Sequence, residues 1–305
     1  MNKNIKDTIY GLAIGDAMGV PYEFIKPEYI DVNCDSFLEM IGNNSYSKVD
    51  KGNWSDDTSL TLASLDSLTK CNSFDKKDQY YRFVNWFSKS HYTSEAGMFD
   101  CGITTLNALN HSKGLDHERS CGNGSLMRII PFVYYLLDED DVDVRYNVIK
   151  EASSMTHAHH RCVNACFVYT EFARRLLIND VEDKSNLNKY LEEVLDYTLT
   201  KINSSEEKEL FKLFLNLNNI SEITGKGYVM NTLTISLYCL LNTNNYEEAI
   251  LKAISFGYDT DTNAACTGAL AGIYYGFDSI PSKWIDTLLN KDVLDNLIDK
   301  WNERK

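Results

Sequence analysis

Apolar residues recur at helical spacing along most of the chain, and we find no convincing alternating strand pattern. Side chains three and four residues apart share one face of a helix, so this spacing predicts amphipathic helices. The predicted helices cover approximately residues 5–18, 55–65, 77–89, 102–110, 125–130, 160–178, 185–202, 205–216, 227–241, 246–256 and 282–303. Only four prolines interrupt the chain, and proline strongly breaks helices. We therefore predict an all-α fold, with residues 1–305 forming a single compact multi-helix orthogonal bundle.

Two segments carry small residues at every fourth position. The first set is Gly11, Gly15 and Gly19, and the second set is Ala264, Gly268 and Gly272. A glycine inside a helix costs about 1 kcal/mol, so three on one face indicate that close packing offsets the cost. We predict that another helix approaches each of these faces closely.

The charge balance is acidic, with 30 lysines and arginines against 44 aspartates and glutamates, a net charge of −14. No basic block is present, which argues against nucleic acid or an anionic membrane surface as the main partner. No stretch approaches the ~20 apolar residues that span a bilayer, and the polar start is unlike a signal peptide. The eight cysteines are scattered. We therefore expect a cytoplasmic protein without disulfides.

Two acidic segments stand at predicted helix starts. Residues 55–58 read Ser-Asp-Asp-Thr, and residues 259–262 read Asp-Thr-Asp-Thr. One interpretation is capping, because acidic residues in a first turn interact favourably with the helix dipole. Capping explains the adjacent Asp56 and Asp57 less well, since neighbouring carboxylates repel unless a cation or a proton lies between them. Together the two segments offer enough oxygen ligands for a two-cation site.

Three further positions are candidates that also have an ordinary explanation. Glu23 lies between two aromatic residues, where partial desolvation prepares a carboxylate for acid or base chemistry, although a surface glutamate is the simpler interpretation. Asp100 precedes a predicted helix, where capping is the simpler interpretation. Residues 122–124, Gly-Asn-Gly, precede another predicted helix. Such a loop presents backbone N–H groups to an anion, although a plain turn also fits.

Three histidines fall close together, at His157, His159 and His160. No second histidine or cysteine pattern completes a zinc site with them. We interpret His157, at a helix start, as a contact to a ligand hydroxyl group, and the other two as solvated.

Taken together, these segments resemble the ADP-ribosylglycohydrolase family, which includes the dinitrogenase reductase-activating glycohydrolases and related arginine- and serine-ADP-ribose hydrolases. The matching segments are residues 11–24, 54–58, 100–105, 122–128, 156–157 and 259–262. They run in the family's order and span nearly the whole chain, so the ordered set is specific. The resemblance implies an all-α fold with a dinuclear cleft that holds two Mg²⁺ or Mn²⁺ ions.

The resemblance also assigns roles to individual residues. The implied metal ligands are Ser55, Asp56, Asp57, Asp259, Asp261 and Thr262. Glu23 is implied to be a catalytic or substrate-positioning carboxylate, and Asp100 a catalytic one. The implied diphosphate contacts are Asn123, Gly124 and Ser125. His157 is implied to contact the ribose side of the ligand.

One position departs from the family's pattern. The family has Gly-Gly before the second acidic segment, whereas this chain has Gly257 and Tyr258. A ring at this position can narrow the cleft, stack on a ligand or point away. We therefore include Tyr258 among the candidate substrate contacts.

The function implied by the resemblance is metal-dependent hydrolysis of the glycosidic bond at ribose C1″. The partner is an ADP-ribosylated protein, modified on a side chain such as arginine or serine, or another ADP-ribose conjugate, and ADP-ribose is the product. The alternative is a non-catalytic ADP-ribose-binding or crystallin-like structural member of the same fold. A phosphatase nucleophile at residues 259–262 would need a buried strand just upstream, and the pattern of residues 249–256 is helical.

Overall fold

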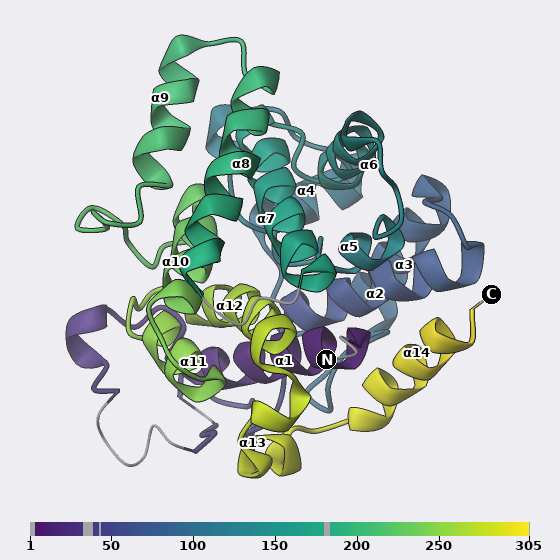
Figure 1. The fold of residues 1–305 in the computed structure, drawn as a ribbon. Helices are drawn as coiled ribbons and strands as arrows, with labels where there is room; N and C mark the ends of the chain where they lie inside the picture. Colours follow the sequence, from purple (N-terminus) through teal and green to yellow (C-terminus); the bar gives the residue numbers. More distant parts are fainter. Residues whose placement is uncertain (1–3, 33–38, 43, 180–183, 305) are drawn as a thin grey trace.

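The computed structural model describes residues 4–32, 39–42, 44–179 and 184–304, which contain fourteen α-helices and no β-strand (Figure 1). The helices are α1 (Ile5–Gly19), α2 (Asp56–Cys71), α3 (Lys76–Lys89), α4 (Ile103–His111), α5 (Pro131–Tyr135), α6 (Val142–Ser154), α7 (His160–Ile178), α8 (Ser185–Lys201), α9 (Ser205–Phe214), α10 (Val229–Leu241), α11 (Tyr246–Ile254), α12 (Thr260–Tyr275), α13 (Ser282–Thr287) and α14 (Lys291–Glu303). The all-α prediction is confirmed.

The helices α1 and α12 form the centre of the fold and lie side by side in Figure 1. Their small-residue faces meet each other almost backbone to backbone. A Cβ atom added to Gly11 would lie 2.3 Å from the carbonyl oxygen of Gly268, and one added to Gly15 would lie 2.2 Å from that of Ala264. The predicted close approach is therefore confirmed, and each of the two faces is the other's partner.

The remaining helices pack around this central pair. Helices α10 and α11 pack against α12, while α6, α8 and α10 pack against α7. Helix α2 contacts α3, α5 and α14. Large side chains, including Trp54, Trp86 and Trp284, are fully buried in the resulting core. Because α1, α2 and α12 each contact the other two, their polar ends are held close together.

One local prediction differs from the structure. Residues 124–128 form a turn rather than the start of a helix, and helix α5 begins only at Pro131. Proline suits the first position of a helix because its ring presets φ and it lacks the N–H that would need a partner. The helices predicted within residues 282–303 are present as α13 and α14, which residues 288–290 separate, and Asn290 adopts a left-handed conformation with φ of 52°.

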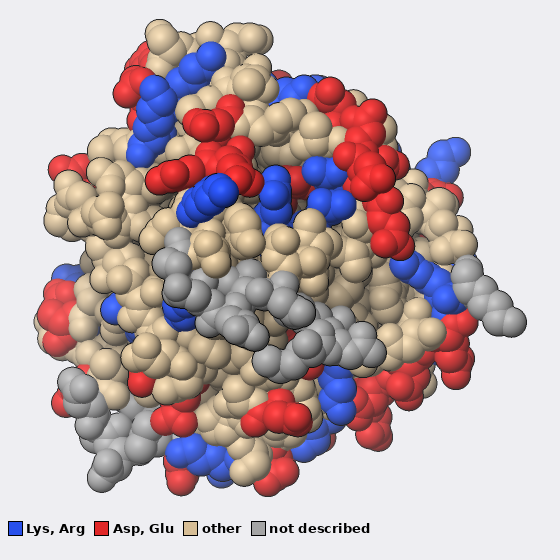
Figure 2. Space-filling model, viewed as in Figure 1, with Lys and Arg blue, Asp and Glu red and all other residues tan. Residues whose placement is uncertain are grey.

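The surface carries both signs of charge (Figure 2), and the described cysteines form no disulfide. Acidic and basic side chains are interspersed over the face shown in Figure 2. The seven cysteines within the described residues are free thiols, and Cys34 lies outside those residues. Among the described helices, none combines the length and the hydropathy needed to cross a bilayer.

Candidate functional site

A cavity of about 580 Å³ opens beside the N-termini of α2, α4 and α12. Its lining consists of residues 23–24, 56, 100–105, 122–124, 127, 157, 226–227, 258–259 and 262. The predicted site residues in this lining are Glu23, Asp56, Asp100, Asn123, Gly124, His157, Tyr258, Asp259 and Thr262. The fold therefore brings together residues from segments that are distant in the sequence.

Four predicted residues lie outside the lining. Ser55 caps α2, and its hydroxyl group donates a hydrogen bond of 2.9 Å to Oδ2 of Asp57. Asp57 and Asp261 are buried, with exposed fractions of 1% each. The hydroxyl oxygen of Ser125 lies 2.9 Å from that of Ser153, deep in the protein. The contact between Ser125 and a diphosphate stays a prediction.

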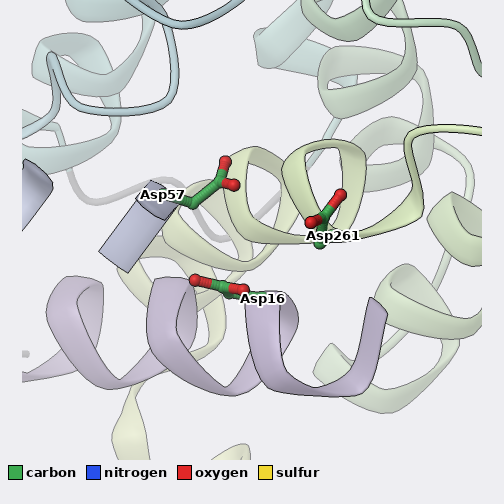
Figure 3. Close-up of side chains that lie close together, drawn as sticks. All are labelled: Asp16, Asp57 and Asp261. Carbon is green, nitrogen blue, oxygen red and sulfur yellow. The ribbon is translucent and has the colours of Figure 1, made fainter. Parts of the chain in front are cut away.

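Three buried carboxylates from three different helices lie close together (Figure 3). One oxygen atom from each of Asp16, Asp57 and Asp261 lies within 4.8 Å of the others. The same limit holds for Glu23, Asp100 and Asp261, so Asp261 belongs to both groups. Carboxylates at such separations are suited to binding divalent cations that prefer oxygen ligands.

The hydrogen bonds within this cluster leave one oxygen atom without a partner. Oδ2 of Asp57 accepts hydrogen bonds from Ser55 and, over 3.3 Å, from the hydroxyl group of Thr262. Oδ1 of Asp57 is buried and has no hydrogen-bond partner among the described residues. A buried carboxylate oxygen without a donor is costly, and a cation bound at this oxygen would offset that cost.

Electrostatics also indicate that the cluster needs positive charge or protons. Burial raises the pKa of Asp56, Asp57 and Asp261 well above the usual value, and the neighbouring carboxylates raise it further. Buried like charges repel strongly because the surroundings screen them poorly. A bound cation would reverse this effect and favour the ionised form.

Asp16 was not predicted from the sequence, although it is central to the cluster. Its carboxylate accepts hydrogen bonds from the backbone N–H of Ser55 at 3.0 Å and from the N–H of Thr58, also at 3.0 Å. The hydroxyl group of Thr58 donates to it at 2.6 Å. Burial raises the pKa of Asp16 to about 6 despite these bonds. The available signal was an acidic residue next to Gly15, on a helix whose neighbours are almost all apolar or small.

Glu23 is held by a second residue that the sequence did not reveal. The hydroxyl group of Tyr46 donates a hydrogen bond of 2.5 Å to Oε2 of Glu23. Burial raises the pKa of Glu23 to about 8, and the charge of Asp100 adds to the effect. Asp100 accepts a hydrogen bond of 2.8 Å from the backbone N–H of Cys101. Burial raises the pKa of Asp100 as well.

The Gly-Asn-Gly loop connects the cavity to the second acidic segment. The side-chain amide of Asn123 donates to Oδ2 of Asp259 at 2.7 Å and to the hydroxyl group of Thr232 at 2.9 Å. Asn123 therefore orients Asp259, which is the N-terminal cap residue of α12 but makes no side-chain capping bond. The side chain of Asp259 therefore lines the cavity and accepts a hydrogen bond from Asn123.

Tyr258 lies at the rim of the cavity in a strained backbone conformation, with φ of 62°. Its N–H donates to the carbonyl oxygen of Ile25 at 2.7 Å, and its own carbonyl oxygen accepts from the N–H of Phe24 at 2.5 Å. The Lys226 ammonium lies 5.3 Å from the centre of the Tyr258 ring. Within the lining, Lys226 is the sole lysine or arginine side chain.

Comparisons with known proteins point to one family. The family model described as ADP-ribosylglycohydrolase matches residues 2–305. An ADP-ribosylarginine hydrolase of Serratia proteamaculans (strain 568) is 29% identical over 302 residues, covering 97% of this chain and 78% of that protein. The ADP-ribosyl-(dinitrogen reductase) glycohydrolase of Rhodospirillum rubrum is 25% identical over 282 residues, covering 91% of this chain and 87% of that protein. A solved structure described as an ADP-ribosylglycohydrolase-related protein complex has a TM-score of 0.81 at 26% identity, covering 100% of this chain and 99% of that one.

Proposed function

This chain belongs to the ADP-ribosylglycohydrolase family, and from that premise we propose that it is a metal-dependent hydrolase that removes ADP-ribose from a modified acceptor. The bond cleaved is the glycosidic bond at ribose C1″. The observation that carries the proposal is a pair of three-carboxylate clusters that share Asp261, next to residues that line a cavity of about 580 Å³. The cavity is large enough for most of a nucleotide-sized ligand.

The residues present suit one or two hard divalent cations. Asp57 has a buried oxygen atom without a partner among the described residues, and Asp261 lies close to it. Carboxylate and hydroxyl oxygens are the ligands that such cations prefer. The proposed holders are Ser55, Asp56, Asp57, Asp259, Asp261 and Thr262. Mg²⁺ or Mn²⁺ bound here supplies Lewis acidity and offsets the negative charge of the carboxylates.

Glu23 and Asp100 are the proposed proton-transfer groups. Tyr46 donates a hydrogen bond to Oε2 of Glu23, and Glu23 is also hydrogen-bonded to Asp261. Burial favours the protonated form of the Glu23 carboxyl group, and in that form it can donate the proton to a leaving group. A cation bound nearby acts in the opposite direction. Asp100, which lies in the same carboxylate cluster as Glu23 and Asp261, is the candidate to accept a proton from water.

Arginine is the acceptor we propose to test first. The Serratia relative is named as an ADP-ribosylarginine hydrolase. In this chain, the carboxylates that line the cavity are Glu23, Asp56, Asp100 and Asp259. A guanidinium leaving group carries positive charge, and a site lined with carboxylates attracts it.

The test is release of ADP-ribose from peptides modified on arginine or on serine, with Mg²⁺, Mn²⁺ or EDTA, followed by mass spectrometry. We expect metal-dependent release that is faster from arginine. Release from serine alone would overturn the acceptor assignment. Binding of ADP-ribose without release from any acceptor would replace the hydrolase with the non-catalytic alternative.

A further inference from the structure

His157 is held rigidly at the wall of the cavity. Its backbone N–H donates to the carbonyl oxygen of Ser153 at 2.9 Å, and its carbonyl oxygen accepts from the Ser153 hydroxyl group at 2.9 Å. The ring packs against the Gly-Asn-Gly loop so closely that a Cβ atom on Gly124 would lie 2.8 Å from Cε1 and 3.3 Å from Nε2. The Nε2 edge of the ring therefore faces the loop and the cavity that both line.

The other ring nitrogen, Nδ1, faces a buried hydrogen-bond relay. Nδ1 lies 2.8 Å from the hydroxyl oxygen of Thr156. The same oxygen lies 2.9 Å from Nη2 of Arg128, which also donates to the carbonyl oxygen of Ala152 at 3.1 Å. Arg128, Thr156 and His157 are almost completely buried, with exposed fractions of 0%, 1% and 2%. Little water reaches this relay to offer alternative partners.

The chemistry of the three groups determines where each proton lies. Burial lowers the pKa of Arg128 to about 10, so the guanidinium is charged at neutral pH and acts only as a donor. The Thr156 oxygen must then accept from Arg128. Its single hydrogen atom has one acceptor within reach among the described residues, Nδ1 of His157. A proton on Nδ1 instead would leave the buried threonine hydrogen unpaired, which is unfavourable.

We propose that Arg128, acting through Thr156, holds His157 in the tautomer that carries its proton on Nε2, so that the ring presents an N–H donor to the ligand cavity. The expected acceptor is a ribose or phosphate oxygen of ADP-ribose. Burial and the nearby charge of Arg128 lower the pKa of His157 to about 3, so the ring stays neutral and the donor comes from tautomer choice, not from protonation. Arg128 and Thr156 are positioning residues, since neither lines the cavity.

This inference rests on the proposed function only in naming ADP-ribose as the ligand, and its first test needs no ligand. The test measures ¹⁵N NMR shifts of the histidine rings in the full chain, which has six histidines. The His157 signals are assigned by their loss in His157→Asn. We expect Nδ1 to show the shift of an unprotonated nitrogen and Nε2 that of a protonated one between pH 6 and 8. A protonated Nδ1 in the wild-type protein would overturn the proposal.

The second test compares two variants that differ in one hydroxyl group. Thr156→Val removes the relay, whereas Thr156→Ser keeps it and serves as the matched control. We expect Thr156→Val to bring a population with the proton on Nδ1 and to weaken ADP-ribose binding about 10-fold, with Thr156→Ser within about 2-fold of wild type. Equal weakening in both variants, with the wild-type tautomer retained, would overturn the role of the hydroxyl group. The expected tautomer together with no ADP-ribose binding in the wild-type protein would instead remove the proposed function and leave the relay in place.

Discussion

The hydroxyl group of Thr262, in the first turn of α12, donates a 3.3 Å hydrogen bond to Oδ2 of Asp57, in the first turn of α2. The two residues are 205 positions apart. Their contact brings two helix N-termini to one place, and the partial positive charge of each N-terminus favours nearby anions. The helix ends thus offset part of the repulsion within the carboxylate cluster, and a cation would offset the rest.

Asp57→Asn tests how much of the repulsion among the carboxylates a bound cation offsets. We expect the variant, measured in EDTA, to be more stable than wild type by about 1 kcal/mol, because it removes one of several mutually repelling buried charges. Mg²⁺ at about 100 times its Kd should stabilise the wild-type protein by about 2.7 kcal/mol, and the variant should lose most of that gain. Thermal unfolding with Mg²⁺ or EDTA measures both effects.

Asp286→Asn, on the exposed surface of α13, is the matched control and should respond to Mg²⁺ as the wild type does. Turnover of an ADP-ribosylated peptide should fall by about 100-fold or more in Asp57→Asn and in Asp261→Asn. Full stabilisation of Asp57→Asn by Mg²⁺ would show that the cation does not bind at this cluster.

Gly15→Ala should destabilise the protein by about 3 kcal/mol, since a well-packed interface cannot accept an added atom without shifting. The new Cβ atom would lie 2.2 Å from the carbonyl oxygen of Ala264 on α12. Gly122→Ala is the control, because its Cβ atom would lie 3.6 Å from the nearest side-chain atom. Chemical denaturation should place that variant within about 0.5 kcal/mol of wild type. Similar losses in both variants would contradict the close α1–α12 contact as the cause.

The buried ring of His157 should make stability depend on pH. Its pKa in the folded protein is lowered to about 3 by burial and by Arg128, whereas an unfolded histidine titrates near 6.5. Between those values the unfolded chain binds a proton that the folded chain excludes, so stability falls as the pH falls. The stability of wild type minus that of His157→Asn should decrease by roughly 1.4 kcal/mol per pH unit from pH 6 to pH 4.

Urea denaturation at several pH values measures this difference. His111→Asn, at an exposed position, is the control and should follow the wild-type curve. A difference between wild type and His157→Asn that does not change with pH would contradict a neutral buried ring.

Lys226→Gln should weaken ADP-ribose binding about 5- to 10-fold at low salt while leaving adenosine binding unchanged. Lys226 is the sole lysine or arginine in the cavity lining, whose acidic members are Glu23, Asp56, Asp100 and Asp259, so we expect it to be the positive partner of a diphosphate. The difference should shrink as salt increases, because screening shortens the reach of an exposed charge. Calorimetric titration of both ligands measures it.

Lys252→Gln is the matched control, since Lys252 also lies over a tyrosine ring, 4.8 Å from the centre of Tyr238, but outside the cavity lining. It should bind both ligands as the wild type does. Equal losses of adenosine and ADP-ribose in Lys226→Gln would indicate that the lysine supports the rim rather than the diphosphate.

The sequence predicted those features that depend on local spacing. The four-residue repeats of small residues predicted close helix contacts, and the acidic helix starts predicted that carboxylates would gather. It did not reveal Asp16 or Tyr46, whose partners lie far along the chain: Thr58 is 42 residues from Asp16, and Glu23 is 23 residues from Tyr46. The predicted helix start at Ser125 was wrong because apolar spacing alone does not distinguish a tight turn before Pro131 from a first helical turn. The roles assigned to the site residues stay predictions until the variants are measured.

The backbone contact between α1 and α12 also constrains how this protein can diversify. Asp16 and Asp261 lie on two helices that have almost no side chains between them at their closest points. A larger side chain there would push the helices apart, so the distance between the two carboxylates cannot be adjusted gradually by substitution. At the rim, the backbone of Phe24 and Tyr258 is held by positive φ values and by a hydrogen bond between them. The side chains there have more room, since Phe24 and Ile103 are largely exposed. New acceptor preferences would therefore arise at the rim by changing side chains, while the spacing of the buried carboxylate cluster stays the same. A library built for altered specificity should vary the rim and leave the glycine faces untouched.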